Sequence, residues 1–198
     1  MSDRNSNHES WEKFLNPTIL RDSLISVSLY ITAFELFKTQ VISKPETFFS
    51  EGFDKDGLIL GKEYEREVMS KSKSKLYASL LWIKENGGID EDDLKLFDSA
   101  RLHRNELAHQ ILRYISDSQK NVDPMLLTKL IALLAKIEKW WFQWFELAIQ
   151  PDLLPDGADP DDVVAGPIWS LQMMLDIALG DDEKSSSYYK EWLKIRGR

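Results

Sequence analysis

Residues 90–115, DEDDLKLFDSARLHRNELAHQILRYI, decide how we interpret the fold of this chain. At about 100° per residue, the apolar residues of this stretch fall on one broad stripe of a helix. The acidic run 91–93 complements the positive end of the helix dipole at the start of the stretch. The pattern therefore predicts an amphipathic helix whose stripe consists of Leu96, Phe97, Ala100, Leu107, Ala108, Ile111, Leu112 and Ile115.

A long helix is also predicted before this segment. Apolar residues recur at three- and four-residue steps across 20–43, and Asn16 followed by Pro17 is a typical cap and first helical position. We expect Pro45 to end this helix and 46–61 to form a loop, because proline interrupts helical hydrogen bonding and the loop is rich in glycine.

Two more long helices are predicted on either side of the central one. The first covers 62–85 and is stopped by Gly87, since glycine adopts the left-handed cap conformation at low cost. The second covers 124–149 and begins at Asp123-Pro124, a cap followed by proline in the first turn.

These helices predict an all-α fold, an antiparallel four-helix bundle with short accessory C-terminal helices and no strand. Residues 1–16 form a leader, with Trp11 and Phe14 as docking points, and 17–149 form the bundle. Residues 150–198 form a loop rich in proline and aspartate followed by two short helices, over 168–179 and 186–195.

The composition excludes several kinds of catalytic and metal-binding site. The chain has 198 residues, a formal net charge of −8 and no cysteine, which excludes disulfides, thiolate catalysis and thiolate zinc sites. No two histidines stand at metal-ligand spacing, so we expect no metal and no cofactor. The acidic charge repels a phosphate backbone, so nucleic-acid binding needs a local basic surface. The polar start and the absence of an apolar run of about 20 residues favour a cytoplasmic protein without a membrane segment.

Arg104 is the unusual residue of the central helix. It projects from the middle of the apolar stripe, and Asn105 and His109, four residues apart, lie together at its margin. A charge among core positions is costly unless it is paired or kept at a wet cleft. One interpretation pairs Arg104 with Glu35, at the edge of the stripe of the first helix. The other keeps Arg104 at a wet cleft or an interface, and the two are compatible.

Arg104-Asn105, three residues and His109 together resemble the signature of the HEPN family, which carries it on a late helix of a four-helix bundle. The resemblance covers about 17–149. It implies a metal-independent RNA endonuclease of the toxin, phage-defence or abortive-infection kind, active as a homodimer and regulated by an antitoxin or another protein partner. Family members inactivated by nucleotidylation carry tyrosine two positions after the histidine, where this chain has Ile111, so that regulation is not expected.

The resemblance also implies a role for each residue. His109 transfers protons, Arg104 binds the charge that develops on phosphate, Asn105 orients either group, and Glu35 supports Arg104. Arg101 and Arg113 are the candidate RNA-binding residues, together with the lysines of the run 71–75. No metal ligand is assigned.

Two other functions stay open. A non-catalytic HEPN bundle would bind a protein partner or a nucleotide and retain Arg104 and His109 for structure. An unrelated helical protein would assemble through its aromatic fourth helix. For that aromatic run we favour core packing or an interface over base stacking; its members are Trp140, Trp141, Phe142, Trp144 and Phe145.

Overall fold

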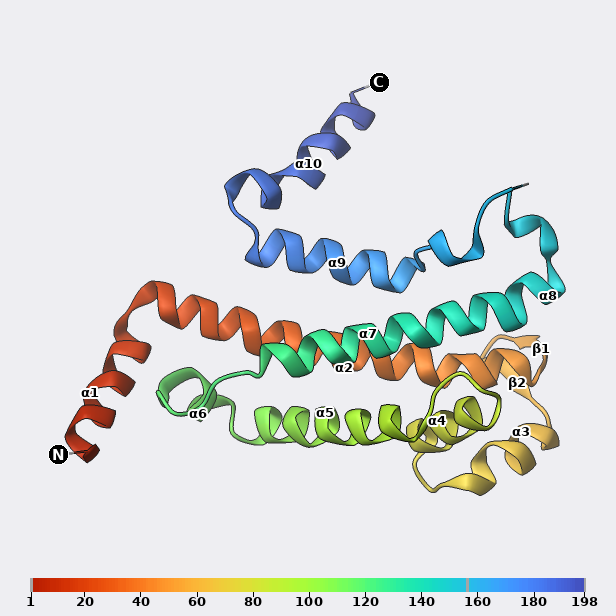
Figure 1. Ribbon diagram of the computed structural model, residues 1–198, viewed down its shortest axis with the longest axis horizontal. Coiled ribbons are helices and arrows are strands. Elements are labelled where there is room, and N and C mark those ends of the chain that lie inside the picture. The colour runs from red at the N-terminus through yellow and green to blue at the C-terminus, as the bar shows by residue number, and fades with distance from the viewer. Residues whose placement is uncertain (1, 156, 198) are drawn as a thin grey trace.

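The computed structural model describes residues 2–155 and 157–197, with side chains from residue 6 onward. The described chain is mostly helical, with one small two-stranded sheet, which confirms the prediction of a helical protein. A long helix, α2 (Pro17–Phe48), runs the length of a bundle-like assembly, and α5 (Glu91–His109) lies antiparallel to it (Figure 1). α7 (Pro124–Trp141) and the shorter α4 (Lys75–Glu85) complete the bundle-like assembly.

The start of α2 follows the prediction and its end does not. Asn16 Oδ1 accepts hydrogen bonds from the N–H groups of Thr18 and Ile19, at 3.0 and 3.4 Å. The helix continues through Pro45 to Phe48, so the prediction that Pro45 ends it is wrong. Proline has no N–H to donate four residues back, but the helix continues for one more turn, and the carbonyl of Pro45 accepts from the N–H of Phe49.

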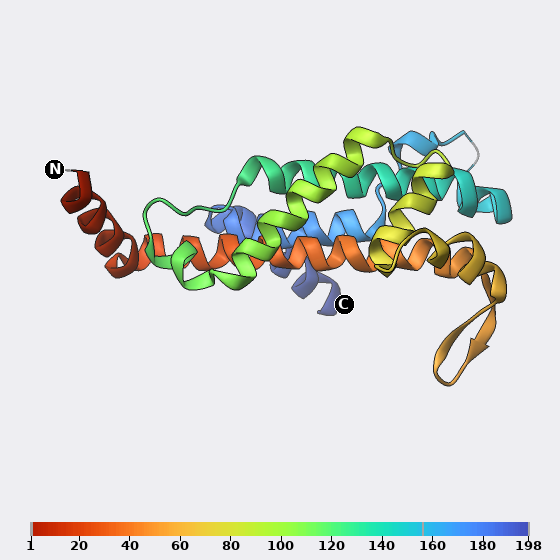
Figure 2. The same ribbon diagram turned by 90° about the horizontal axis from the view of Figure 1, so that it is seen from below.

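The region predicted as a loop contains a hairpin. β1 (Ser50–Asp54) pairs antiparallel with β2 (Gly57–Leu60), and the hairpin extends from the bundle (Figure 2). Gly57 has a φ of 121° in the connection, which only glycine adopts without strain. The prediction of no strand is therefore wrong for this segment.

The helix predicted over 62–85 is two helices. α3 (Lys62–Glu67) passes through a 3₁₀ turn, Met69–Lys71, and α4 begins only at Lys75. Ser74 Oγ accepts a hydrogen bond from the N–H of Tyr77, so the serine caps a new helix instead of continuing the old one. The lysine run 71–75 thus crosses a break and is not one helix face.

The central helix is shorter than predicted. Its start is a capping box, in which the side chains of Asp90 and Asp93 each accept from the other's backbone N–H. Its end is His109, because Gln110 leaves the helical region with φ −123° and ψ 29°. A separate short helix, α6 (Ile111–Ser116), follows.

The fourth helix begins as predicted and ends differently. Asp123 Oδ1 accepts from the N–H of Leu126 and caps α7. After Trp141 the chain forms a π-helical turn, Phe142–Glu146, and then the short α8 (Leu147–Ile149). The aromatic residues of this region pack in a cluster, in which the ring pairs include Trp140 with Trp144, Trp141 with Phe145, and Phe48 with Trp82.

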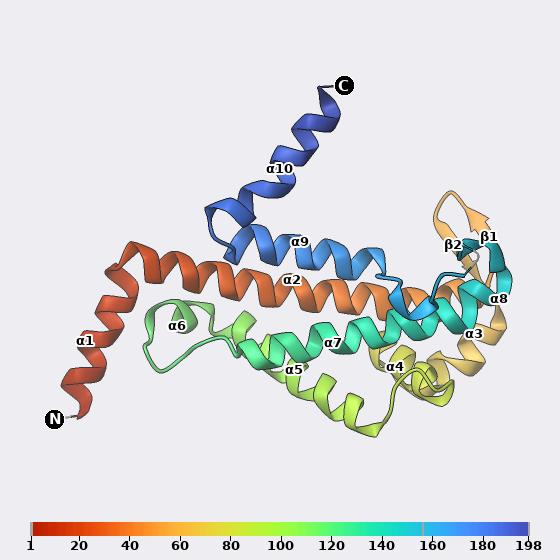
Figure 3. The ribbon, with the colours of Figure 1, turned by 45° about the horizontal axis from the view of Figure 1, so that its top comes forward.

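Both terminal regions are helical. The predicted leader is α1 (Ser2–Leu15), and Lys13 is buried, donating to the carbonyls of Asp117 and Lys120 and to Asn121 Oδ1. After 3₁₀ turns at Pro151–Leu153 and Pro160–Asp162, α9 (Gly166–Leu179) lies along α2 and α7. α10 (Asp182–Arg196) packs on α9 and points away from the bundle (Figure 3).

The main core lies between α2, α4, α5 and α7. Phe97 of α5 stacks with Phe34 and Phe37 of α2, at centroid distances of 6.1 and 5.7 Å. A smaller cluster at the other end of α2 joins Tyr30 to Leu107 and Tyr114. These two clusters fix the position of α5 along α2.

Two segments, Pro17–Phe48 and Pro160–Leu179, are long and apolar enough to cross a membrane by length and composition alone. This differs from the expectation that no such run exists. The observation is weak evidence for a membrane, since α2 is the core helix of the bundle and core helices pass the same test.

Gly88→Ala tests the packing of the turn that precedes α5. A Cβ at this position would lie 2.6 Å from Ile83 Cγ2 and 2.7 Å from Trp140 Cδ2. We expect the free energy of unfolding to fall by about 1–3 kcal/mol, which lowers Tm by roughly 2–4 °C per kcal/mol for a chain of this size. Thermal unfolding followed by circular dichroism measures the change.

The matched control is Gly166→Ala at the start of α9, where nothing lies within 4 Å of the new Cβ. We expect Tm to stay within the range of ordinary surface substitutions. Equal effects of the two substitutions would contradict the packing described around Gly88.

Candidate functional site

Arg104 pairs with Glu35, as one interpretation of the sequence predicted. Arg104 Nη2 donates to Glu35 Oε1 at 2.5 Å, joining α5 to α2. The guanidinium lies 5.7 Å from the ring centroid of Phe34, whose ring also stacks with Phe97. Arg104 is therefore held from two sides by α2.

This ion pair is not deeply buried. The side chains of Arg104 and Glu35 are 30% and 40% exposed. Arg104 Nε is nevertheless covered and donates to no acceptor in the part of the chain that the structure describes. Arg104 thus combines a buried stem with a partly open guanidinium, which suits either a structural clamp or a group that binds an anion.

The electrostatics of Glu35 reflect both its position and its partners. Burial alone would raise the pKa of its carboxyl group, but hydrogen bonds from Arg104 and Lys38 outweigh burial, and the pKa is lowered. Glu35 therefore stays ionised and can orient the guanidinium.

Asn105 and His109 lie further along the same helix. Asn105 is half-buried, and His109 is exposed at the last position of α5. Within residues 2–155 and 157–197, neither side chain is joined to another by a hydrogen bond or an ion pair. The structure thus leaves two side chains without such a partner among these residues: the Asn105 amide, next to Arg104, and the exposed His109 imidazole, about one and a half helical turns further on.

Apolar side chains surround this part of the surface. Leu24, Val27 and Ile31 of α2 and Ile111 of α6 line a shallow pocket of about 280 Å³. Leu112, next to Ile111, is 76% exposed. Since α2 and α5 are antiparallel, these residues of α2 lie on the side of Glu35 that faces the end of α5 and the start of α6 (Figure 1).

The basic residues predicted to bind RNA do not form one surface. Arg101 pairs with Asp98 and Arg113 with Asp117, and both arginines are partly or fully exposed. Lys71 and Lys75 pair with Glu85 and Glu46. The lysine run lies at one end of the bundle and α6 at the other (Figures 1 and 3). Of these residues, the two arginines are near Arg104 in sequence. Arg101 lies on α5 with Arg104, and Arg113 lies on the next helix, α6.

His103, the residue before Arg104, packs against the smaller core cluster. Its ring meets those of Tyr30 and Tyr114 edge-on at 4.8 and 5.8 Å, and its Nε2 accepts from the N–H of Asp123 at 3.2 Å. Burial lowers the pKa of His103, and the carboxylates of Asp123 and Glu106 offset this only in part. Helical periodicity could not reveal this, because the tyrosine rings and the loop that receive His103 come from distant segments.

Among the described residues, no group of three or more histidines, aspartates or glutamates is placed to hold a metal ion. No protein-family model matches the chain, and no match is found among curated proteins or among solved structures. The function of this chain must therefore be inferred from its own residues and their geometry.

Glu35→Gln tests the ion pair between Glu35 and Arg104. Because both partners are partly solvated, we expect the free energy of unfolding to fall by about 0.5–1 kcal/mol at neutral pH. The carboxylate's contribution is complete above its pKa in the unfolded chain, about 4.3, and is lost as the pH falls through its lower pKa in the folded chain. Urea unfolding at a series of pH values measures both effects.

A double-mutant cycle with Arg104→Gln provides the control, since it isolates the interaction between the two side chains. A stability difference between wild type and Glu35→Gln that is unchanged at acid pH would be inconsistent with an ionised Glu35 acting on Arg104.

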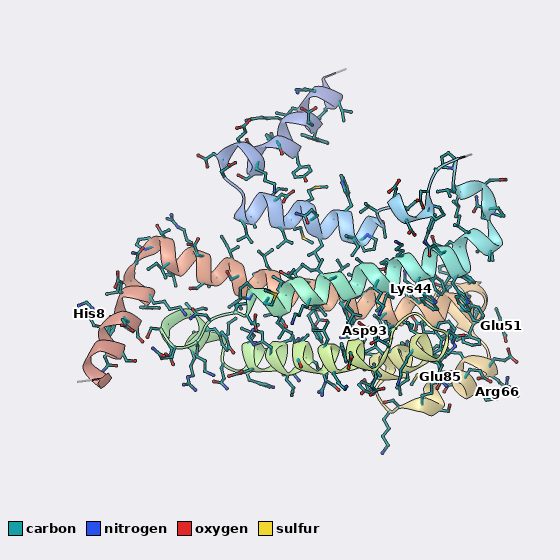
Figure 4. The ribbon with its side chains drawn as sticks, viewed as in Figure 1. His8, Lys44, Glu51, Arg66, Glu85 and Asp93 are labelled. Carbon is teal, nitrogen blue, oxygen red and sulfur yellow. The ribbon has the colours of Figure 1, made fainter. Side chains whose placement is uncertain are left out.

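His103→Gln tests the buried histidine. A lowered pKa means that the unfolded chain binds a proton first, so stability is complete above about pH 6.5 and is lost as the pH falls from there toward the folded-state pKa. We expect wild type to lose more stability than the variant over this interval in urea unfolding. The control is His8→Gln, on the exposed side of α1, which should follow wild type (Figure 4).

Proposed function

We propose that this chain is a metal-independent RNA endonuclease built on a four-helix bundle of HEPN type, in which Arg104, Asn105 and His109 form the active site. A toxin or phage-defence component is the setting that the motif implies. The observation that carries the proposal is that one helix, α5, carries both an exposed imidazole, His109, and a partly open guanidinium, Arg104. Glu35 holds that guanidinium in place.

The chemistry needs only groups that this surface offers. The 2′-hydroxyl of one nucleotide loses its proton to a ring nitrogen of His109 and attacks the adjacent phosphorus. The bond from phosphorus to the 5′-oxygen breaks, and that oxygen takes a proton from a second imidazolium. The products are a 2′,3′-cyclic phosphate and a 5′-hydroxyl.

Arg104 acts on the charge that builds up on the phosphoryl oxygens. Its Nη2 donates to Glu35 and its Nε is covered, so Nη1 is the nitrogen left to donate to an anion. Holding the guanidinium before RNA binds reduces the reorganisation required in the transition state. Asn105, with no partner among the described side chains, orients His109 or a phosphate oxygen.

The second imidazolium comes from a second copy of the chain. Leu24, Ile111 and Leu112 are exposed, Ile31 lines the same pocket as Leu24 and Ile111, and exposed apolar surface of this kind favours association. A two-fold axis through it would bring the two His109 side chains toward one composite site. Arg101 and Arg113 would flank the RNA strand.

His109→Ala tests the catalytic role. The wild type should cleave single-stranded RNA in the presence of a chelator and leave 2′,3′-cyclic phosphate ends. We expect His109→Ala and Arg104→Ala each to reduce the rate by about 100-fold or more. Cleavage followed on gels, with mass spectrometry of the new ends, measures this.

His8→Ala is the matched control, because it removes an exposed histidine of α1, a helix that carries none of the proposed active-site residues (Figure 4). A substrate with a single 2′-deoxynucleotide at the cut position should resist cleavage. If the folded dimer leaves RNA intact, or if His109→Ala cleaves at the wild-type rate, the proposal fails.

A second function is favoured by one observation, the covered Arg104 Nε together with the Glu35 contact, which suits a purely structural arginine. In that case the bundle binds a protein partner or a nucleotide without catalysis. Substituting Arg104 would then lower the free energy of unfolding, and neither the wild type nor the variant would cleave RNA.

A further inference from the structure

A second site lies on another face of the bundle and is independent of Arg104 and His109. A cavity of about 570 Å³ opens between α2, α7 and the segment 161–168 that leads into α9. Its volume is in the range of small-molecule sites. The wall from α7 continues into the π-helical turn, which contributes Phe142 and Glu146. Such π-helical turns occur frequently at functional sites.

Two buried charges line this cavity. Lys44 of α2 donates to Glu138 Oε2 of α7 at 2.8 Å, and each residue is only 6% exposed. Figure 4 shows Lys44 in the dense layer of side chains where α7 crosses α2. The ammonium also lies 5.5 Å from the ring centroid of Trp141. Burying such a pair costs desolvation on both sides, so its presence needs an explanation beyond stability.

The pair is incomplete on the carboxylate side. Glu138 Oε1 is covered and accepts no hydrogen bond from any residue that the structure describes. A buried carboxylate oxygen without a donor is rare in folded proteins, and each instance calls for a specific cause. An N–H that reached Oε1 would form a hydrogen bond at an oxygen already removed from bulk water.

The remaining charges of the cavity favour a cation. Its lining holds two lysines, Lys44 and Lys139, against three carboxylates, on Glu138, Glu146 and Asp161. Lys139 pairs with Asp161 at 3.0 Å, whereas the Glu146 carboxylate is joined to no cation in the described chain. Apart from Gln40, the other lining residues are apolar and include Ala135, Val164 and Ile168.

We propose that this cavity binds a small organic ammonium compound with an apolar body. Its N–H groups donate to Glu138, its charge is balanced by Glu138 and Glu146, and its hydrocarbon part lies against Ala135, Phe142 and Ile168. Binding is reversible and involves no covalent step.

The test compares three probes of similar shape on the full chain: 2-phenylethylammonium, neutral 2-phenylethanol and anionic 3-phenylpropanoate. Titrations followed by methyl NMR report both affinity and place. We expect the ammonium to bind at least tenfold more tightly than the alcohol, with shifts at the methyl groups of Ala135, Val164 and Ile168, and the carboxylate to cause no shift there. Equal binding of ammonium and alcohol, or shifts elsewhere only, would overturn the proposal.

Two variants distinguish the contribution of the Glu138 charge from that of the cavity volume. Glu138→Gln keeps the shape of the side chain and should weaken the ammonium at least tenfold while leaving the alcohol unchanged. Because this variant strands Lys44, Ala135→Met serves as a second test: it fills the cavity without touching the ion pair. Its matched control is Ala132→Met, on the exposed side of the same helix. If Ala135→Met binds the ammonium as tightly as Ala132→Met does, the cavity is not the site.

Discussion

The contact of Phe34 with Phe97 is the interaction on which the rest of this structure depends. It fixes α5 along α2, and the same phenylalanine ring lies beside the Arg104 guanidinium. Glu35, the next residue, then reaches Arg104 because the two helices have this register. The candidate site therefore depends on core packing. Arg104 keeps its place beside the core because the Phe34 ring and the carboxylate of the next residue, Glu35, both contact it.

Local sequence signals predicted the beginnings of helices well and their ends poorly. The caps at Asn16, Asp90 and Asp123 act within three residues, so the sequence alone contains the whole interaction. Helix ends depend on distant partners. α2 continues past Pro45 as Phe48 packs into the aromatic cluster, while the predicted second helix ends at Glu67 and a new one starts after Ser74, whose short side chain caps it.

The same distinction applies to the sites. Arg104 and its partner Glu35 could be predicted, since both stand out against periodic apolar stripes. The role of His103 could not, because its tyrosine neighbours and the Asp123 amide come from three separate segments. Lys44 and Glu138 are 94 residues apart, and Lys44 precedes a proline expected to end its helix, so no local pattern marked either as buried.

The buried Lys13 has a practical consequence for producing this protein. The sequence places the bundle boundary at Pro17, and a shortened chain starting there is the natural choice for expression. Such a chain would lose the ammonium that satisfies the carbonyls of Asp117 and Lys120, just after α6. It would also uncover Ile115, which shares a pocket with Trp11 and Phe14 of α1. Purification tags and truncations are therefore better placed at the C-terminal end, where α10 stands clear of the bundle.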